Sequence, residues 1–278
     1  MLRLLNIEIQ KLRYNKSAKI ISIVYFILIT FIALIASIEF NFGDVKFRVA
    51  DQGIFNFPFI WHFNSWVAAM LKLFLAIVIV SMMANEYSYR TLKQNLIDGL
   101  SKKEFILSKF ITVVGFAAIS TLFLFIVSMI LGLSFSDYKE IGIIFSDMEY
   151  ILAYFIKLVG FFSFCMFLGI LVKRSAFALG FLLIWFIIES VLYGLLKWEF
   201  FRGTDIADKV MMFFPLESME NLIIEPFSRF GAVQSAASQL GEEFTKSYDV
   251  HWYSVLIVLA WTFLFIYGSL AILKKRDL

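Results

Sequence analysis

The stretch Asn85–Phe110, NEYSYRTLKQNLIDGLSKKEFILSKF, is a polar interruption in an otherwise apolar chain. Its basic residues are Arg90, Lys93, Lys102, Lys103 and Lys109, and its acids are Glu86, Asp98 and Glu104. Leucines recur at every fourth position, at Leu92, Leu96 and Leu100, and this spacing places them on one face of a helix. The first part of the stretch is therefore predicted to form a short amphipathic helix.

A break between two helices follows these leucines. Gly99 stands where the end of a helix favours a residue that tolerates a positive φ. Ser101, with Glu104 three residues later, has the spacing of a capping box, so a new helix is expected to begin at this point. The sequence predicts that the chain lies across the membrane face, turns at Gly99 and re-enters the bilayer.

Composition defines the class of protein. The chain is 61% hydrophobic and 17% charged, with a mean hydropathy of +0.83, which is typical of a polytopic membrane protein and excludes a water-soluble domain. The single cysteine, Cys165, permits no intrachain disulfide, and two histidines are too few to suggest a zinc or iron site. The predicted fold class is an all-α membrane protein with an interfacial helix over residues 1–19.

Six apolar runs of 19–23 residues are each long enough to cross a hydrocarbon core of about 30 Å. They are Ile20–Ile38, Trp66–Ala84, Ile111–Leu133, Tyr150–Val172, Ala176–Leu196 and Tyr253–Leu273. No proline falls inside them, so uninterrupted helices are expected. A tight helical hairpin is predicted at residues 173–175, and two short helices are predicted in the long segment 197–252, over Ile206–Leu222 and Phe227–Phe244.

Charge asymmetry orients the spans. The termini, 85–110 and 173–175 together hold 15 Lys and Arg against 5 acids, whereas the opposite segments hold 8 against 16. The positive-inside rule therefore predicts that both termini are cytoplasmic and that 197–252 is extracytoplasmic.

Three charges fall within the predicted spans, at Lys72, Lys157 and Glu189. Each costs at least about 2.5 kcal/mol if it faces lipid, so each requires a partner or a route to water. One interpretation is that they line an outward-facing substrate path. The alternative is that Glu189 pairs with one lysine while the other extends its ammonium group to the interface.

The chain contains no Walker A pattern, nucleophile elbow, HExxH motif or dinucleotide fingerprint. No catalytic, cofactor-binding or metal-binding residue is predicted, and the protein is not expected to be an enzyme. Nothing indicates a nucleic-acid partner.

The layout resembles the permease subunit of ABC transporters of the type-2 class, the six-helix type V exporters. Such subunits begin with an interfacial connecting helix, here 1–19, and carry a coupling element between the second and third spans, here 85–110. The match comprises Asn85-Glu86, Arg90-Thr91-Leu92, Gly99-Leu100-Ser101-Lys102 and Lys109. Two departures are Tyr89-Arg90, where glycine is commoner, and Gly99, where proline is usual.

The resemblance implies one permease domain over 1–278 that pairs with a second permease subunit, identical or homologous, in a prokaryotic inner membrane. Separate cytoplasmic ATPase subunits would bind ATP and Mg²⁺. The residues implied in coupling are Glu86, Arg90, Leu92, Lys93, Leu96, Gly99, Leu100, Ser101, Lys102, Lys103 and Glu104. On this resemblance the leucines would anchor the coupling helix, and five residues would contact the ATPase or lipid headgroups: Glu86, Arg90, Lys93, Lys102 and Lys103. For the basic residues, contact with anionic membrane lipid alone is the alternative.

Two other classes compete with this interpretation. An ion-coupled transporter or channel predicts internal repeats, broken helices and more polar residues near the midplane. A membrane enzyme acting on lipid needs an acid–base or metal constellation, for which only Glu189 and two isolated histidines are available.

Overall fold

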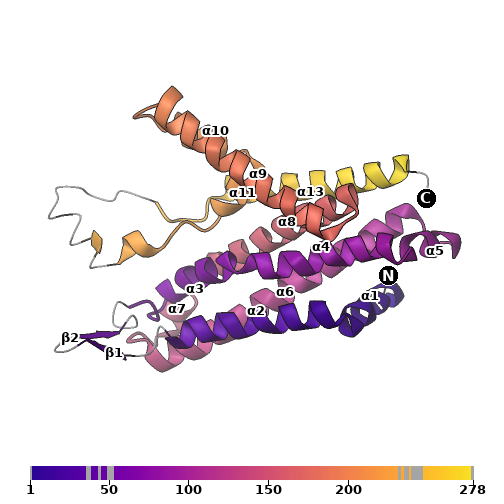
Figure 1. Ribbon diagram of the computed structural model, residues 1–278. Helices are drawn as coiled ribbons and strands as arrows, with labels where there is room; N and C mark the ends of the chain where they lie inside the picture. Colours follow the sequence, from indigo (N-terminus) through magenta and orange to yellow (C-terminus); the bar gives the residue numbers. More distant parts are fainter. Residues whose placement is uncertain are drawn as a thin grey trace.

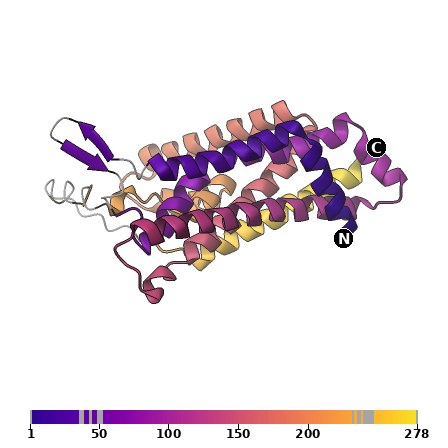
Figure 2. The same ribbon diagram turned by 90° about the horizontal axis from the view of Figure 1, so that it is seen from below.

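The computed structural model describes residues 2–35, 39–42, 45–48, 53–230, 233–234, 238 and 247–276. It is an elongated helical bundle, with both termini at one end and a β-hairpin at the other (Figures 1 and 2). The all-α prediction is confirmed for the bundle, while the hairpin is an unpredicted addition. Its strands are β1 (Glu39–Phe42) and β2 (Val45–Arg48), which pair antiparallel.

The main helices agree with the apolar runs. They are α2 (Lys16–Ile35), α3 (Phe59–Met70), α4 (Lys72–Ser88), α6 (Lys102–Phe135), α8 (Glu149–Val172), α9 (Ser175–Leu195) and α13 (Trp252–Lys275). Among the described residues, four helices are long and apolar enough to cross a membrane, and the number rises to as many as six if each of two bent pairs counts as one span. Several long apolar helices thus indicate an integral membrane protein.

Short elements complete the chain. They are α1 (Leu2–Tyr14), α5 (Thr91–Ile97), α7 (Ile141–Ile144), the π-helical turn η2 (Leu196–Phe200), α10 (Ile206–Met211), α11 (Pro215–Glu220) and the 3₁₀ turn η3 (Phe227–Arg229). The helix predicted over 206–222 is found as two shorter ones, α10 and α11, and Pro215 begins the second. The helix predicted over 227–244 begins with η3 instead, and most of its remaining residues lie outside the described residues.

The second span is not the uninterrupted helix that the sequence predicted. It is divided into α3 and α4, which are bent by 47°. At the break the chain makes i→i+3 bonds, from Leu71 N to Ala68 O and from Phe74 N to Leu71 O, both 3.1 Å. This tightened 3₁₀-like turn bends the helix without a proline.

Helix α8 is the centre of the bundle. In the apolar window of Ile141–Val172, 78% of residues are buried, against 11% in Ser175–Phe200. Helices α4, α6 and α13 pack around α8. A Cβ at Gly169 of α8 would lie 2.7 Å from the Cβ of Met83 in α4, so the missing side chain permits this close approach.

Candidate functional site

Helix α5 and its flanking turns form a compact element at the end of the bundle that holds both termini (Figure 1). Leu92 is buried at 2% exposure, and Leu96 and Leu100 are partly buried against the core, as the four-residue spacing predicted. Gly99 has a φ of +94°, and its amide donates to Leu96 O at 3.2 Å, which closes the helix in a left-handed turn. The leucine face therefore packs α5 against the core of the same chain.

The capping box is confirmed at the start of α6. Ser101 Oγ accepts from Glu104 N at 3.1 Å, and Ser101 N donates to the Glu104 carboxylate at 2.9 Å. The backbone amides of Ser101 and Glu104 at the start of α6 therefore both have hydrogen-bond acceptors. Helix α6 begins directly after the turn and runs into the bundle as one helix of 34 residues.

The opposite face of this element is exposed. Tyr89 and Ile97 are 74% and 75% exposed, and Arg90, Lys93 and Lys103 are exposed beside them. Arg90 has a φ of +57° at the N-cap of α5, where this left-handed conformation favours glycine. The arrangement is a small basic surface with an aromatic and an aliphatic side chain, which we call the α5 surface (Tyr89, Arg90, Lys93, Ile97, Lys103).

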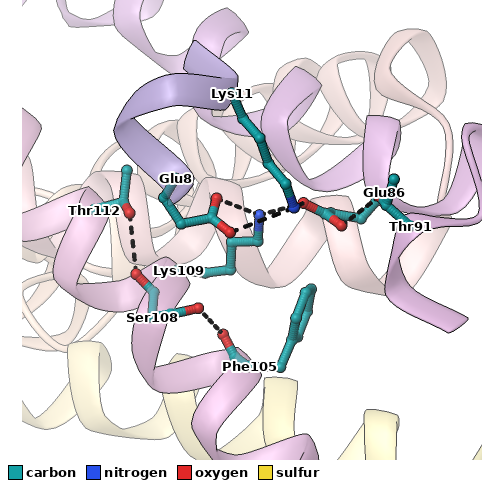
Figure 3. Close-up of polar contacts among 8 residues, drawn as sticks. All are labelled: Glu8, Lys11, Glu86, Thr91, Phe105, Ser108, Lys109 and Thr112. Atoms are coloured by element: carbon teal, nitrogen blue, oxygen red, sulfur yellow. Dashed lines mark hydrogen bonds and ion pairs between the residues drawn. The ribbon is translucent and has the colours of Figure 1, made fainter. Parts of the chain in front are cut away.

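A group of four charges lies behind α5, and we call it the terminal charge cluster (Glu8, Lys11, Glu86, Lys109). Three of them are buried, and Lys11 is partly exposed. Lys109 of α6 donates to the carboxylates of both Glu8 and Glu86, and Lys11 lies 2.8 Å from Glu86 (Figure 3). Thr91, the first residue of α5, donates to the second oxygen of Glu86 at 2.5 Å. The cluster is formally neutral and joins α1, α4, α5 and α6.

This geometry corrects two predicted contacts. Glu86 is 2% exposed and its carboxylate is occupied by Lys109, Lys11 and Thr91, so it does not face a partner protein. The ammonium group of Lys102 donates to the carbonyls of Arg276 at 3.0 Å and Lys274 at 3.4 Å. Lys102 therefore holds the end of α13 against the start of α6.

Sequence reasoning missed Glu8 as a site residue. A signal was present, because Glu8 lies three residues after Leu5 and four before Leu12, on the apolar face of a basic helix. An acid on such a face needs a buried cation, and the structure supplies Lys109, which is fully buried.

Two of the three predicted charges within spans meet in the middle of the bundle. Lys72 and Lys157 both bind the carboxylate of Glu220 from α11, Lys157 at 2.7 Å. We call this the mid-bundle charge cluster (Lys72, Lys157, Glu220).

The alternative in which Glu189 pairs with a lysine is wrong. Its carboxylate accepts the backbone amide of Leu216 at 3.1 Å and that of Glu217 at 2.9 Å, and Trp185 Nε1 at 2.5 Å. Glu189 thus caps the first turn of α11, whose free N–H groups suit a carboxylate. Glu220 provides the lysines' counter-charge from the other end of the same short helix.

A cavity of about 350 Å³ adjoins the mid-bundle charge cluster. Its lining includes Lys72, Lys157 and Glu220, and otherwise apolar side chains of α3, α4, α8, α9 and α11. Lys72 and Lys157 thus line this cavity, whereas Glu189 is not among its lining residues. That they line a substrate path stays a prediction.

A family model described as "Protein of unknown function (DUF2705)" matches residues 23–278. No curated protein matches the chain.

Proposed function

The chain belongs to this family of unknown function, and we propose from its geometry that it is the permease subunit of an ATP-driven ABC exporter. Two permease subunits would enclose the translocation path, and separate cytoplasmic ATPase subunits would bind ATP and Mg²⁺. The observation that carries the proposal is the α5 surface. The seven-residue helix α5, fixed by its leucine face, exposes Ile97, and the turn before it exposes Tyr89, among cations at the end of an apolar bundle.

The side of the membrane follows from the same element. The α5 surface lies at the end of the bundle that holds both termini (Figure 1), and this end carries the excess of Lys and Arg. By the positive-inside rule, this excess supports a cytoplasmic position for that end. The 87° bend between Asn6–Tyr14 and Lys16–Phe31 supports an interfacial α1 that turns into a spanning α2.

The terminal charge cluster provides a route for coupling. Thr91 at the start of α5 is bonded to Glu86 of α4, and Glu86 is bonded to Lys109 of α6. A force on α5 would therefore reach two membrane helices through buried ionic contacts rather than through a flexible loop. ATP binding in the partner would shift the population between two arrangements of these helices, provided that the partner binds one arrangement more tightly.

A pull-down of the tagged chain from its native membrane tests the proposal. We expect a soluble subunit with a Walker A motif to co-purify with the wild-type chain and to be lost from Lys93→Glu/Ile97→Asp. Lys102 is left intact because it holds the C-terminal end of α13. Lys139→Glu is the matched control, since this exposed lysine follows the far end of α6. Absence of an ATPase where a control permease retains its own would contradict the proposal.

A stand-alone ion-coupled transporter is the second candidate. It is favoured by the bend between α3 and α4, which occurs next to Lys72 of the mid-bundle charge cluster. Broken helices beside buried charges are features of such transporters. Substrate movement by purified chain in vesicles under an ion gradient, without any nucleotide, would support this candidate against the first.

A further inference from the structure

The end of helix α8 is capped by a residue from the far end of the chain. The last four carbonyl groups of a helix have no donor within that helix. In α8, the amide of Lys173 reaches the carbonyl of Gly169 at 3.0 Å. The next two carbonyls, of Ile170 and Leu171, both accept from the guanidinium of Arg276, from Nη1 at 2.5 Å and from Nη2 at 2.8 Å. Arg276, which follows α13, therefore closes the last turn of α8.

Arg276 also contacts both segments that flank α5. On one side, Arg276 Nη1 lies 3.4 Å from the hydroxyl of Tyr87 in α4. The Tyr87 carbonyl in turn accepts the amide of Arg90, the N-cap of α5, at 3.2 Å. On the other side, Lys102 at the start of α6 donates to the Arg276 carbonyl at 3.0 Å. One residue therefore connects the end of α4, the start of α6 and the end of α8.

The chemistry of an arginine suits this position. The helix dipole favours a cation near a helix C-terminus, and hydrogen bonds from a charged donor are roughly twice as strong as neutral ones. The guanidinium is planar and presents its N–H groups in a fixed fork, so one side chain can bind two neighbouring carbonyls. Arg276 is half-buried at the end of the bundle that holds α5 (Figure 1). It is therefore a fixed contact rather than a freely solvated cation.

From this arrangement we infer that Arg276 is the positioning residue that connects the α5 surface to the hairpin between α8 and α9. A shift of α5 would reach Arg276 through Tyr87 and Lys102, and Arg276 would transmit it to the end of α8. The terminal charge cluster joins α5 to α1, α4 and α6 and does not include α8. The inference deepens the proposed function and rests on it for the role of the α5 surface as a docking site, whereas the positioning itself requires no ATPase.

Hydrogen–deuterium exchange of the full-length chain in detergent micelles tests the positioning. Arg276→Met removes the charge and all the donors of the side chain. It should speed exchange of the amides in 88–101 and 170–176 about fivefold or more, because charge-assisted hydrogen bonds that hold both segments are lost. Lys275→Met is the matched control, since it removes the same charge from the exposed neighbouring position, and it should leave exchange in both segments unchanged.

Arg276→Lys separates the charge from the geometry. An ammonium group keeps the positive charge at the end of α8 but lacks the planar fork. Exchange in 88–101 should therefore lie between the wild type and Arg276→Met, and Arg276→Lys replaces the methionine variant if that variant aggregates. Equal exchange in the Arg276 variants and Lys275→Met would overturn the inference. Faster exchange spread evenly over 206–220 and the centre of α8 would also overturn it, because that pattern reports a general loss of stability.

The ATPase pull-down on the same variants separates this inference from the proposed function. Arg276→Met leaves every side chain of the α5 surface intact, yet it should lower recovery of the ATPase several-fold, while Lys275→Met should not. If the wild type recruits no ATPase but exchange changes as expected, the positioning is supported and the proposed function fails. If the wild type recruits an ATPase and Arg276→Met changes neither exchange nor recovery, the inference fails and the proposed function stands.

Discussion

At the scale of single residues, the buried charges of the terminal charge cluster each contact an opposite charge. In the terminal charge cluster, Lys109 is completely buried and touches two carboxylates, while Lys11 is the partly exposed fourth member. Removal of one member of a buried pair leaves an uncompensated charge and costs about 3–5 kcal/mol, whereas removal of both is much less costly. The cluster therefore behaves as one unit.

We expect Glu86→Gln to destabilise the chain by about 3–5 kcal/mol, because Lys109 then faces Glu8 with one charge fewer around it. Glu86→Gln/Lys109→Met restores neutrality and should recover part of the lost stability. Unfolding in detergent, followed by circular dichroism against denaturant concentration, measures both. A double variant less stable than the single one would contradict this account.

Arg90 illustrates backbone strain at one position. Its φ of +57° is a left-handed conformation that costs a non-glycine residue about 1 kcal/mol or more. Arg90→Gly should therefore leave the fold intact or raise its thermal midpoint, while Arg90→Val should lower it, since a β-branched residue is least tolerant of this region. Thermal melting in detergent, followed by circular dichroism, checks the pair, and equal midpoints would argue against strain at this turn.

At the scale of elements, α11 is positioned by two acids at its ends. Glu189 of α9 accepts two amides of its first turn, and Glu220 at its last position binds Lys72 and Lys157. A helix of six residues is not stable by itself in water, so these contacts and the burial of Met219 decide that it forms.

Glu189→Ala should therefore release α11 from the bundle. Deuterium uptake by the peptide around 206–220 is expected to rise several-fold in this variant. Glu189→Gln retains one acceptor oxygen and should give a smaller increase, while Glu199→Ala on the exposed turn after α9 is the control. Unchanged exchange in Glu189→Ala would mean that apolar packing alone holds α11.

At the scale of the whole molecule, close helix approach depends on glycine only at particular contacts. A Cβ at Gly169 would overlap Met83, whereas a Cβ at Gly180 on α9 would meet nothing within 4 Å. Alanine is otherwise favoured over glycine within a helix by roughly 0.5–1 kcal/mol.

The two substitutions should therefore differ in their effect on the thermal midpoint of unfolding. Gly169→Ala is expected to lower the thermal midpoint, because α4 and α8 must separate, and Gly180→Ala is expected to leave it unchanged or raise it. Both are measured by melting in the same detergent. Equal effects would show that α4 and α8 are less tightly packed than this contact indicates.

Much of the local structure of this protein was predictable from short sequence patterns. The apolar runs, the hairpin at 173–175, the turn at Gly99 and the capping box at Ser101 depend on interactions within a few residues, and each was predictable from the sequence. The number of Lys and Arg in each segment also distinguished the two ends of the bundle. Such a count does not depend on which residues are in contact.

Which charged residues distant in the chain contact one another was not predictable from the sequence. Sequence reasoning paired Glu189 with a lysine, yet the lysines bind Glu220, and it assigned Glu86 to an external contact, yet Glu86 is buried against Lys109. The bend between α3 and α4 was also missed, since no proline marks it. Composition and periodicity by themselves determined that this is a helical membrane protein and where its helices lie. Tertiary packing alone decided which buried charges meet, because that depends on which helix faces come within hydrogen-bond distance, and residues as far apart as 72 and 220 share no local signal.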